Sequence, residues 1–457
     1  MQTLILAGAL LLMMSFAYRF GRNRVLAQVD GRPDALHSLP GYYGWWVALW
    51  CGLPAFGLLT LWLMAEPSLI RALVIGSLPS EMQALSDDQI AVLINEVRNA
   101  VLGHATANPA LAMAAEHYTH LTRVGFAAMA AVALALALGG GLYAYGRLEP
   151  QLRARPRVEA TVKVFLVASS TAAIFTTIGI VLSLLFEALR FFQMVPITDF
   201  LFGLGWSPQM SIRADQTGSS GAFGMVPLFT GTLLVSVVAM VVAAPLGLLA
   251  AIYMSEYAQP KVRAMAKPLL EILAGIPTVV FGFFAVITVA PMIRSLGEVF
   301  GLTVAAESAL AAGLVMGITL IPLISSLSDD VITAVPQSLR EGAFGLGATR
   351  SETIIQVVLP AALPGIVGGI LLAVSRAIGE TMIVVMAAGL SAKLTFNPLE
   401  AVTTVTVQIV TLLIGDTEFD SPKTLAAFAL GLVLFGITLG LNVVALHIVQ
   451  KYREKYD

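Results

Sequence analysis

The sequence has little charge and almost no cysteine. Only 12% of its 457 residues are Asp, Glu, Lys or Arg, and 58% are hydrophobic, whereas soluble domains carry roughly 25% charged residues. The single cysteine, Cys51, excludes a disulfide within the chain and a metal site built from several cysteines. We therefore expect most of the chain to lie in a lipid bilayer.

Motifs for covalent chemistry are also missing. The sequence contains no G-x-x-x-x-G-K-[ST] phosphate loop, no H-E-x-x-H pair, no G-x-S-x-G and no cluster of metal-ligating residues. A net charge of −2 without a long basic segment argues against a nucleic-acid partner. The sequence thus predicts neither an enzyme nor an ATPase, with no catalytic residue, metal or cofactor.

Long apolar runs are what the sequence does contain. A membrane-spanning helix needs about 20 mostly apolar residues. Nine runs meet this condition, near residues 2–18, 44–64, 124–146, 164–189, 228–254, 269–293, 308–327, 363–390 and 425–448. The predicted fold class is therefore an all-α integral membrane protein.

The loops between these runs indicate orientation and domains. With the N-terminus outside and the C-terminus inside, the inner segments hold most of the Lys and Arg residues, as the positive-inside rule requires. The segment 147–163 contains Arg and Pro and is interpreted as a linker. It separates residues 1–160, with three spans and an outer helical loop, from residues 161–457, with six spans.

The later spans contain helix breakers at depth, namely Pro245, Gly247, Gly275, Pro277, Gly282 and Pro322. Breaks within a bilayer are tolerated where protein or a water-filled cavity satisfies the backbone, as in transporters. Glu271, at the start of the run 269–293, either serves the cytosolic mouth of a path or favours a helix N-terminus. We favour the second interpretation of Glu271.

A polar loop between two spans, residues 336–361, has a helical pattern. Pro336 is suited to open a helix, Gly347 leaves a gap for another backbone, and Leu359-Pro360 closes the segment. Its apolar positions form one stripe: Leu339, Ala343, Leu346 and Ala348. The pattern predicts a short amphipathic helix, which either rests on lipid headgroups or inserts into a groove on a cytosolic partner.

Two charges lie inside the run 363–390. Arg376 is near its middle, and Glu380 follows four residues later, on the same helical face. A charge there costs about 3 kcal/mol even on the mildest scale, so it is kept when it is paired or functional. Either Arg376 and Glu380 form a structural pair, or Arg376 faces a hydrated path and binds an oxyanion, with Ser375 and Thr381 as nearby hydroxyl donors.

At these residues the sequence resembles the type I permease subunits of bacterial ATP-binding-cassette importers. Their signature is E-A-A, three residues, G, nine residues, I, one residue, L-P. Here it is Glu341-Gly342-Ala343, Gly347, Val357 and Leu359-Pro360, with Gly342 in place of Ala and Val357 in place of Ile. The resemblance implies that this loop is the coupling helix that docks on the ATPase subunit.

Within that class the sequence resembles the phosphate importer permeases of the PstC type, over about residues 160–457. The matching stretches are FLFGLGWSP, FGMVPLFTGTL, PLGLLAAIYMSEYA, LLEILAGIPTVVFGFFA and RAIGETMIVVMAAG. In that family the residues here numbered Arg376 and Glu380 are associated with phosphate passage. The first 160 residues look like the N-terminal extension of a longer variant, whose role the resemblance leaves open.

The resemblance implies a permease subunit of an ATP-driven phosphate importer, working by alternating access in the bacterial inner membrane with a periplasmic N-terminus and a cytoplasmic C-terminus. Its implied partners are a second permease subunit, two ATP-binding-cassette ATPase subunits, a periplasmic phosphate-binding protein and membrane lipid. Four alternatives stay open: the partner permease of the same importer, an importer of another oxyanion, an anion transporter driven by an ion gradient, and a non-transporting assembly subunit.

Overall fold

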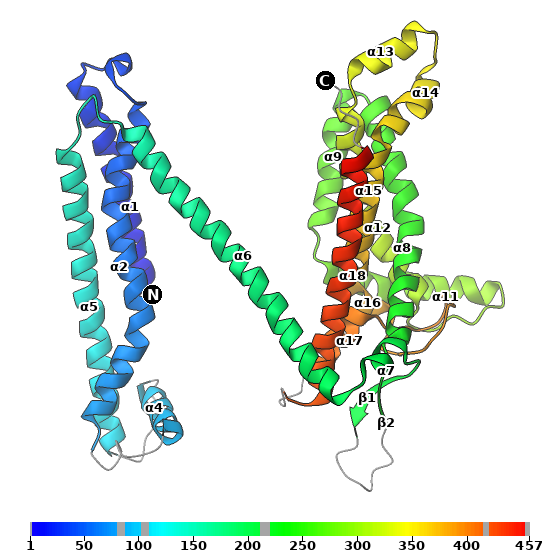
Figure 1. The fold of residues 1–457 in the computed structure, drawn as a ribbon, viewed down its shortest axis with the longest axis horizontal. Coiled ribbons are helices and arrows are strands. Elements are labelled where there is room, and N and C mark those ends of the chain that lie inside the picture. The colour runs from blue at the N-terminus through cyan, green and yellow to red at the C-terminus, as the bar shows by residue number, and fades with distance from the viewer. Residues whose placement is uncertain (1, 80–86, 102–108, 211–219, 415–419, 453–457) are drawn as a thin grey trace. The chain divides into compact units, whose positions relative to one another are not determined.

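The computed structural model describes residues 2–79, 87–101, 109–210, 220–414 and 420–452. Within these ranges the chain is helical apart from one two-stranded hairpin, and nine helices are long and apolar enough to cross a membrane (Figure 1). The predicted fold class is therefore confirmed. The chain divides into two compact units, residues 1–174 and 175–457, each with its own core.

The first unit is built from long helices. They are α1 (Gln2–Gln28), a 3₁₀ turn (Pro33–Ala35), α2 (Pro40–Ser77), α4 (Asp87–Val101), α5 (Pro109–Gly146) and the first part of α6 (Ala154–Met194). Helices α2 and α5 approach closely, because a Cβ on Gly140 would lie 2.2 Å from the Trp50 carbonyl oxygen. Small residues such as Ala55 and Ala137 are fully buried there, which is how helices pack in lipid.

The second unit begins with the end of α6 and has many more elements. They are α7 (Ile197–Phe202), strands β1 (Trp206–Met210) and β2 (Ser220–Phe223), α8 (Val226–Ile252), α9 (Pro260–Gly275), α10 (Thr278–Phe284), α11 (Ala290–Val299), α12 (Ala309–Ala334), α13 (Gln337–Gly345), α14 (Arg350–Thr353), α15 (Leu359–Ile378), α16 (Met382–Ala387), α17 (Val405–Leu413) and α18 (Pro422–Tyr452). Antiparallel β1 and β2 pair Trp206 with Phe223. Helices α8 and α12 pack through small residues, with Gly313 and Gly317 against α8.

The span predicted at residues 269–293 is displaced in the structure. Helix α9 ends at Gly275, and the following span covers Thr278–Val299. Ile276 has an extended backbone, with φ −71° and ψ 130°, because a residue before proline avoids the helical region. Pro277 therefore divides what hydropathy alone merged into one run.

The span predicted at residues 363–390 is also wrong at both ends. The helix runs from Arg350 through a π turn at Ile354–Val358 to Ile378. Leu359-Pro360 therefore lies inside a continuous helix and does not close the loop. The π turn, in which Leu359 donates to the Ile354 carbonyl, accommodates a proline that lacks an N–H donor.

Candidate functional site

The predicted helix in the polar loop is present as α13, directly after Pro336. Gly347 follows it with φ +89°, a conformation that L side chains rarely adopt. The Ala348 amide donates to the Ala343 carbonyl, and the Gly347 amide donates to the Phe344 carbonyl. These two bonds form a Schellman motif, so Gly347 ends the helix in addition to leaving open space beside it.

The apolar stripe predicted for α13 is only partly correct. Leu339 packs against the buried residues Ile332 and Val335. Leu346, however, lies after the helix end and is 92% exposed. Phe344, which lies within α13, is also exposed. Two apolar side chains of the loop thus face away from their own unit.

The signature residues occupy three different settings. Glu341 and Gly342 are exposed on α13, and Ala343 is half-buried there. Val357 lies in the π turn, and Leu359 and Pro360 begin α15. The segment between them starts at Thr349, whose side chain and that of Glu352 form a capping box.

Arg340 fixes α13 to the rest of the unit. Its guanidinium lies 2.9 Å from the Glu256 carboxylate and also donates to the backbone carbonyls of Ile332 and Val335. Both charged side chains are about a tenth exposed, 11% and 10%. Sequence reasoning missed this pair, although a lone Glu256 just after a long apolar run was a usable signal.

Arg376 lies in the last turn of α15 and not in the middle of a span, because α15 ends at Ile378. Its side chain is exposed. Within the described residues it makes no ion pair or side-chain hydrogen bond. The ion pair between Arg376 and Glu380, which the sequence left open as an alternative, is therefore absent among the residues that the structure describes.

Glu380 lies outside the helix, so it does not share a helical face with Arg376. Its carboxylate accepts hydrogen bonds from the Met382 and Ile383 amides at 3.1 and 3.4 Å, which caps α16. Thr381 precedes α16 and donates to the Gly379 carbonyl. The spacing of four residues failed because Gly379 interrupts the helix between the two charges.

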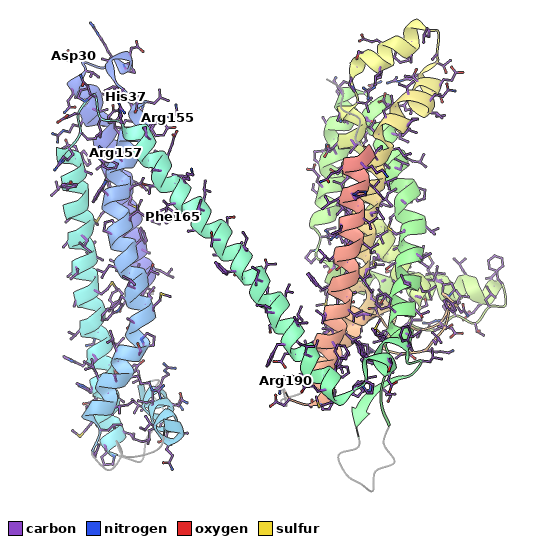
Figure 2. All side chains as sticks on the ribbon, in the orientation of Figure 1. Asp30, His37, Arg155, Arg157, Phe165 and Arg190 are labelled. Carbon is purple, nitrogen blue, oxygen red and sulfur yellow. The ribbon has the colours of Figure 1, made fainter. Side chains whose placement is uncertain are left out.

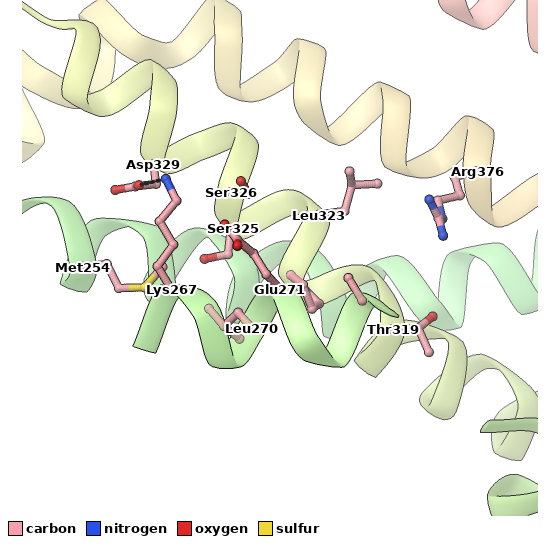
Figure 3. A pocket seen from close by; sticks show the side chains of 12 residues that line it. Met254, Lys267, Leu270, Glu271, Thr319, Leu323, Ser325, Ser326, Asp329 and Arg376 are labelled. Carbon is pink, nitrogen blue, oxygen red and sulfur yellow. Dashed lines mark hydrogen bonds and ion pairs between the residues drawn. The ribbon is translucent and has the colours of Figure 1, made fainter. Parts of the chain in front are cut away.

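Arg376 lines a pocket of about 250 Å³ in the second unit. Its walls come from Met254 in the π turn that follows α8, from α9 and α12, and from Arg376 itself on α15. Figure 3 shows Arg376 at one end and the ion pair between Lys267 and Asp329 at the other. Ser375, Glu380 and Thr381 do not line it.

The inner charges of this pocket form a compact network. The Asp329 side chain is 1% exposed and accepts hydrogen bonds from Arg263 and Lys267, all at 3.0 Å. The hydrogen bond to Asp329 is the largest of the effects that raise the pKa of Lys267 above its usual value. Lys267 is therefore a cation throughout the physiological pH range. Sequence reasoning did not find Asp329, because its partners are more than sixty residues away.

Glu271 and two hydroxyl residues complete the polar lining. Glu271 is exposed near the C-terminal end of α9, so our preferred interpretation of it as a residue favouring a helix N-terminus is wrong. It lines the pocket together with Ser325 and Ser326. The Ser325 hydroxyl is buried and has no hydrogen-bond partner in the described part of the chain. Such a group is commonly satisfied by water or a ligand.

This combination suits a transient anion site. Arg376 offers an uncommitted guanidinium, a group with several donors in a fixed plane that matches an oxyanion. Besides Arg376, the pocket is lined by a further cation, Lys267, and by the carboxylates of Asp329 and Glu271. Together with the broken helices, these features are those of a membrane transport protein.

The comparisons with known proteins agree with this class. Residues 243–454 match the family of binding-protein-dependent transport system inner membrane components, and residues 7–176 match a family described as phosphate ATP-binding cassette transporter. The probable ABC transporter permease protein YqgH of Bacillus subtilis is 34% identical over 284 residues, which are 62% of this chain and 86% of the relative.

Two further relatives are phosphate permeases. PstC 1 of Mycobacterium tuberculosis is 34% identical over half of this chain and 73% of its own length. PstC of Mesorhizobium japonicum is 30% identical over half of this chain and 74% of its own length. The chain belongs to the family of ATP-binding-cassette transporter permeases that contains the PstC-type phosphate transport proteins. The alignment with the first-unit family extends the recognised region to the N-terminal part that the sequence resemblance left open.

Proposed function

We propose that this chain is a permease subunit of an ATP-driven importer and passes inorganic phosphate across the bacterial inner membrane. The PstC relatives support the substrate, and the lack of a phosphate-loop motif in this sequence supports the proposal that separate chains hydrolyse ATP. The basic inner loops support a periplasmic N-terminus and a cytoplasmic C-terminus.

The observation that carries the transport path is Arg376, which lies exposed at the pocket in the second unit and has no ion-pair partner among the described residues. Phosphate entering this pocket receives charge-assisted hydrogen bonds from Arg376, with the Lys267 ammonium at the opposite end. Ser375, Glu380 and Thr381 act beside this path, where the Glu380 carboxylate holds the start of α16 in place.

The coupling to ATP hydrolysis is proposed for the loop 336–361. Glu341, Gly342, Ala343, Gly347, Val357, Leu359 and Pro360 carry the signature, and the exposed Phe344 and Leu346 offer apolar surface to a partner. The proposed assembly contains a second permease subunit, two ATPase subunits and a periplasmic phosphate-binding protein. Alternating access then requires that motion of α13 reach α8 through the Arg340–Glu256 pair.

The test replaces Arg376 by Gln in the complete importer reconstituted in liposomes. One lost charge-assisted hydrogen bond reduces ATP-dependent phosphate uptake about tenfold or more, while the amount of assembled complex stays unchanged. The matched control is Lys261→Gln, which removes an exposed cation of α9 that does not line the pocket. Normal uptake by Arg376→Gln, or an equal loss in both variants, contradicts the proposed path.

A further inference from the structure

We infer that the first unit carries a binding site for an anionic phospholipid, formed by one face of α2 and the first turns of α6. The site lies within residues 1–174 and is separate from the pocket of the second unit. It gives the N-terminal unit a ligand that the transport proposal does not require.

The apolar part of the site is a groove of about 240 Å³. Its α2 wall consists of residues spaced as one helical face, and its other wall is on α6: Trp46, Leu49, Trp50, Leu53, Pro54 and Thr161. The α2 wall is nine residues long, which corresponds to about 12 Å along the helix axis. A groove of this length and composition accommodates part of an acyl chain.

The charged part lies at the Trp46 end of the groove. Arg157 is one helical turn before Thr161, and its guanidinium carbon lies 5.2 Å from the centre of the Trp46 ring. Figure 2 labels Arg155 and Arg157 at the beginning of α6, where their spacing of two residues directs them to different faces of the helix. Arg155 is committed to Glu159 at 2.6 Å, whereas Arg157 has no carboxylate within ion-pair distance in the described residues.

Trp46 begins a row of three aromatic rings, and a second guanidinium, that of Arg147, contacts the other end of this aromatic row. The Trp46 and Trp50 rings are in edge contact at 5.7 Å, and Trp50 contacts Tyr143 at 5.2 Å. Arg147 lies 5.2 Å from the Tyr143 ring and likewise has no carboxylate partner in the part of the chain that is described. The aromatic row therefore connects two cations whose charge is not balanced by acidic side chains.

One polar atom of the groove also lacks a partner. The indole Nε1–H of Trp46 is buried and meets no acceptor in the described ranges. A buried donor without an acceptor is uncommon in native proteins. A headgroup phosphate or glycerol ester oxygen beside Arg157 is an acceptor that this indole reaches once its ring turns toward the groove.

The chemistry favours a lipid over a free anion. Inorganic phosphate is attracted by Arg157 and Arg147 but gains nothing from Leu49 and Leu53. A zwitterionic lipid fits the groove, but its cationic headgroup opposes the arginines. An anionic phospholipid such as phosphatidylglycerol matches both parts, since basic residues near the membrane surface attract anionic headgroups.

The experiment measures lipid retained by the purified complete importer, using native mass spectrometry. The protein is exposed to phosphatidylglycerol, to phosphatidylcholine with the same acyl chains, or to inorganic phosphate. We expect phosphatidylglycerol to be retained in preference to phosphatidylcholine. Arg157→Gln reduces this preference about fivefold, the factor expected for one basic residue at an anionic surface. The control Arg71→Gln removes an exposed arginine of α2 outside the groove and leaves the preference unchanged.

Leu53→Trp is a second variant, which fills the groove from an exposed position and keeps both arginines. It reduces phosphatidylglycerol retention while the complex stays assembled. The inference is overturned if Arg157→Gln and Arg71→Gln behave alike, or if phosphatidylcholine is retained as well as phosphatidylglycerol. It is also overturned if inorganic phosphate displaces the lipid, which would indicate a site for free anions.

Discussion

The two units of the chain use apolar helices differently. In the first unit, α2 and α5 run for 38 residues each, and each contains only one acidic residue and one arginine. In the described part of the second unit, π turns at Tyr253–Tyr257, Ala285–Val289 and Ile354–Val358 and the break at Pro277 interrupt the helices, and the Asp329 carboxylate is buried. Uninterrupted helices satisfy their backbone alone, whereas interrupted ones depend on neighbouring protein.

The difference indicates a division of roles. Close helix packing at Gly140 makes the first unit a regular scaffold. The second unit holds charges inside its helical layer, where they require partners, and these partners join α8 to α13 and α9 to α12. We therefore expect charge removal to damage the second unit most and steric change to damage the first.

The largest effect is expected from Arg340→Gln. The change leaves the Glu256 carboxylate, which is about a tenth exposed, without its cation, and losing one partner of a buried pair costs about 3 kcal/mol. Thermal unfolding of the purified full-length protein in detergent measures this loss. The double variant Arg340→Gln with Glu256→Gln recovers most of it, because no uncompensated charge remains. A double variant as unstable as the single one would show that the pair itself is not the cause.

The second-largest effect is expected from Asp329→Asn. It lowers the free energy of unfolding by about 2 kcal/mol, because it weakens the charge-assisted hydrogen bonds to Arg263 and Lys267. Asp330→Asn is the matched control, since Asp330 is 65% exposed and contacts only Lys267 among the described residues. Its cost is below about 1 kcal/mol, as for other surface ion pairs. Equal unfolding temperatures for the two variants would contradict the central role given to the buried carboxylate.

Gly140→Ala tests the first unit and has the smallest expected effect, about 1.5 kcal/mol. The added methyl group meets the Trp50 carbonyl at 2.2 Å, so α2 and α5 must separate, and overpacking of this kind costs about 1–3 kcal/mol. Gly139→Ala provides the comparison, because nothing lies within 4 Å of its added carbon. That variant is neutral or stabilising, since alanine favours a helix. Destabilisation by Gly139→Ala alone would refute the packing argument.

The features of this protein that could be predicted from the sequence are those that a local pattern of residues encodes. Hydropathy identified the nine spans because each depends on a continuous apolar run, and Pro336 marked the start of the helix in the loop 336–361, whereas its end at Gly347 was not predicted. Hydropathy missed residues 350–356, which are not part of the apolar run but belong to the same continuous helix. It failed again at Gly379, because the end of α15 depends on Glu380 capping the next helix and not on apolarity.

The sequence by itself determined the membrane class, the number of long apolar helices and the helix in the loop 336–361, because each of these is encoded by neighbouring residues. Only the tertiary structure decided which charges meet. Asp329 pairs with Arg263 and Lys267, Arg340 pairs with Glu256, and Arg376 keeps no partner among the described residues. These outcomes depend on which helix faces pack together, and the contacting residues are too far apart in sequence for any local periodicity to specify them.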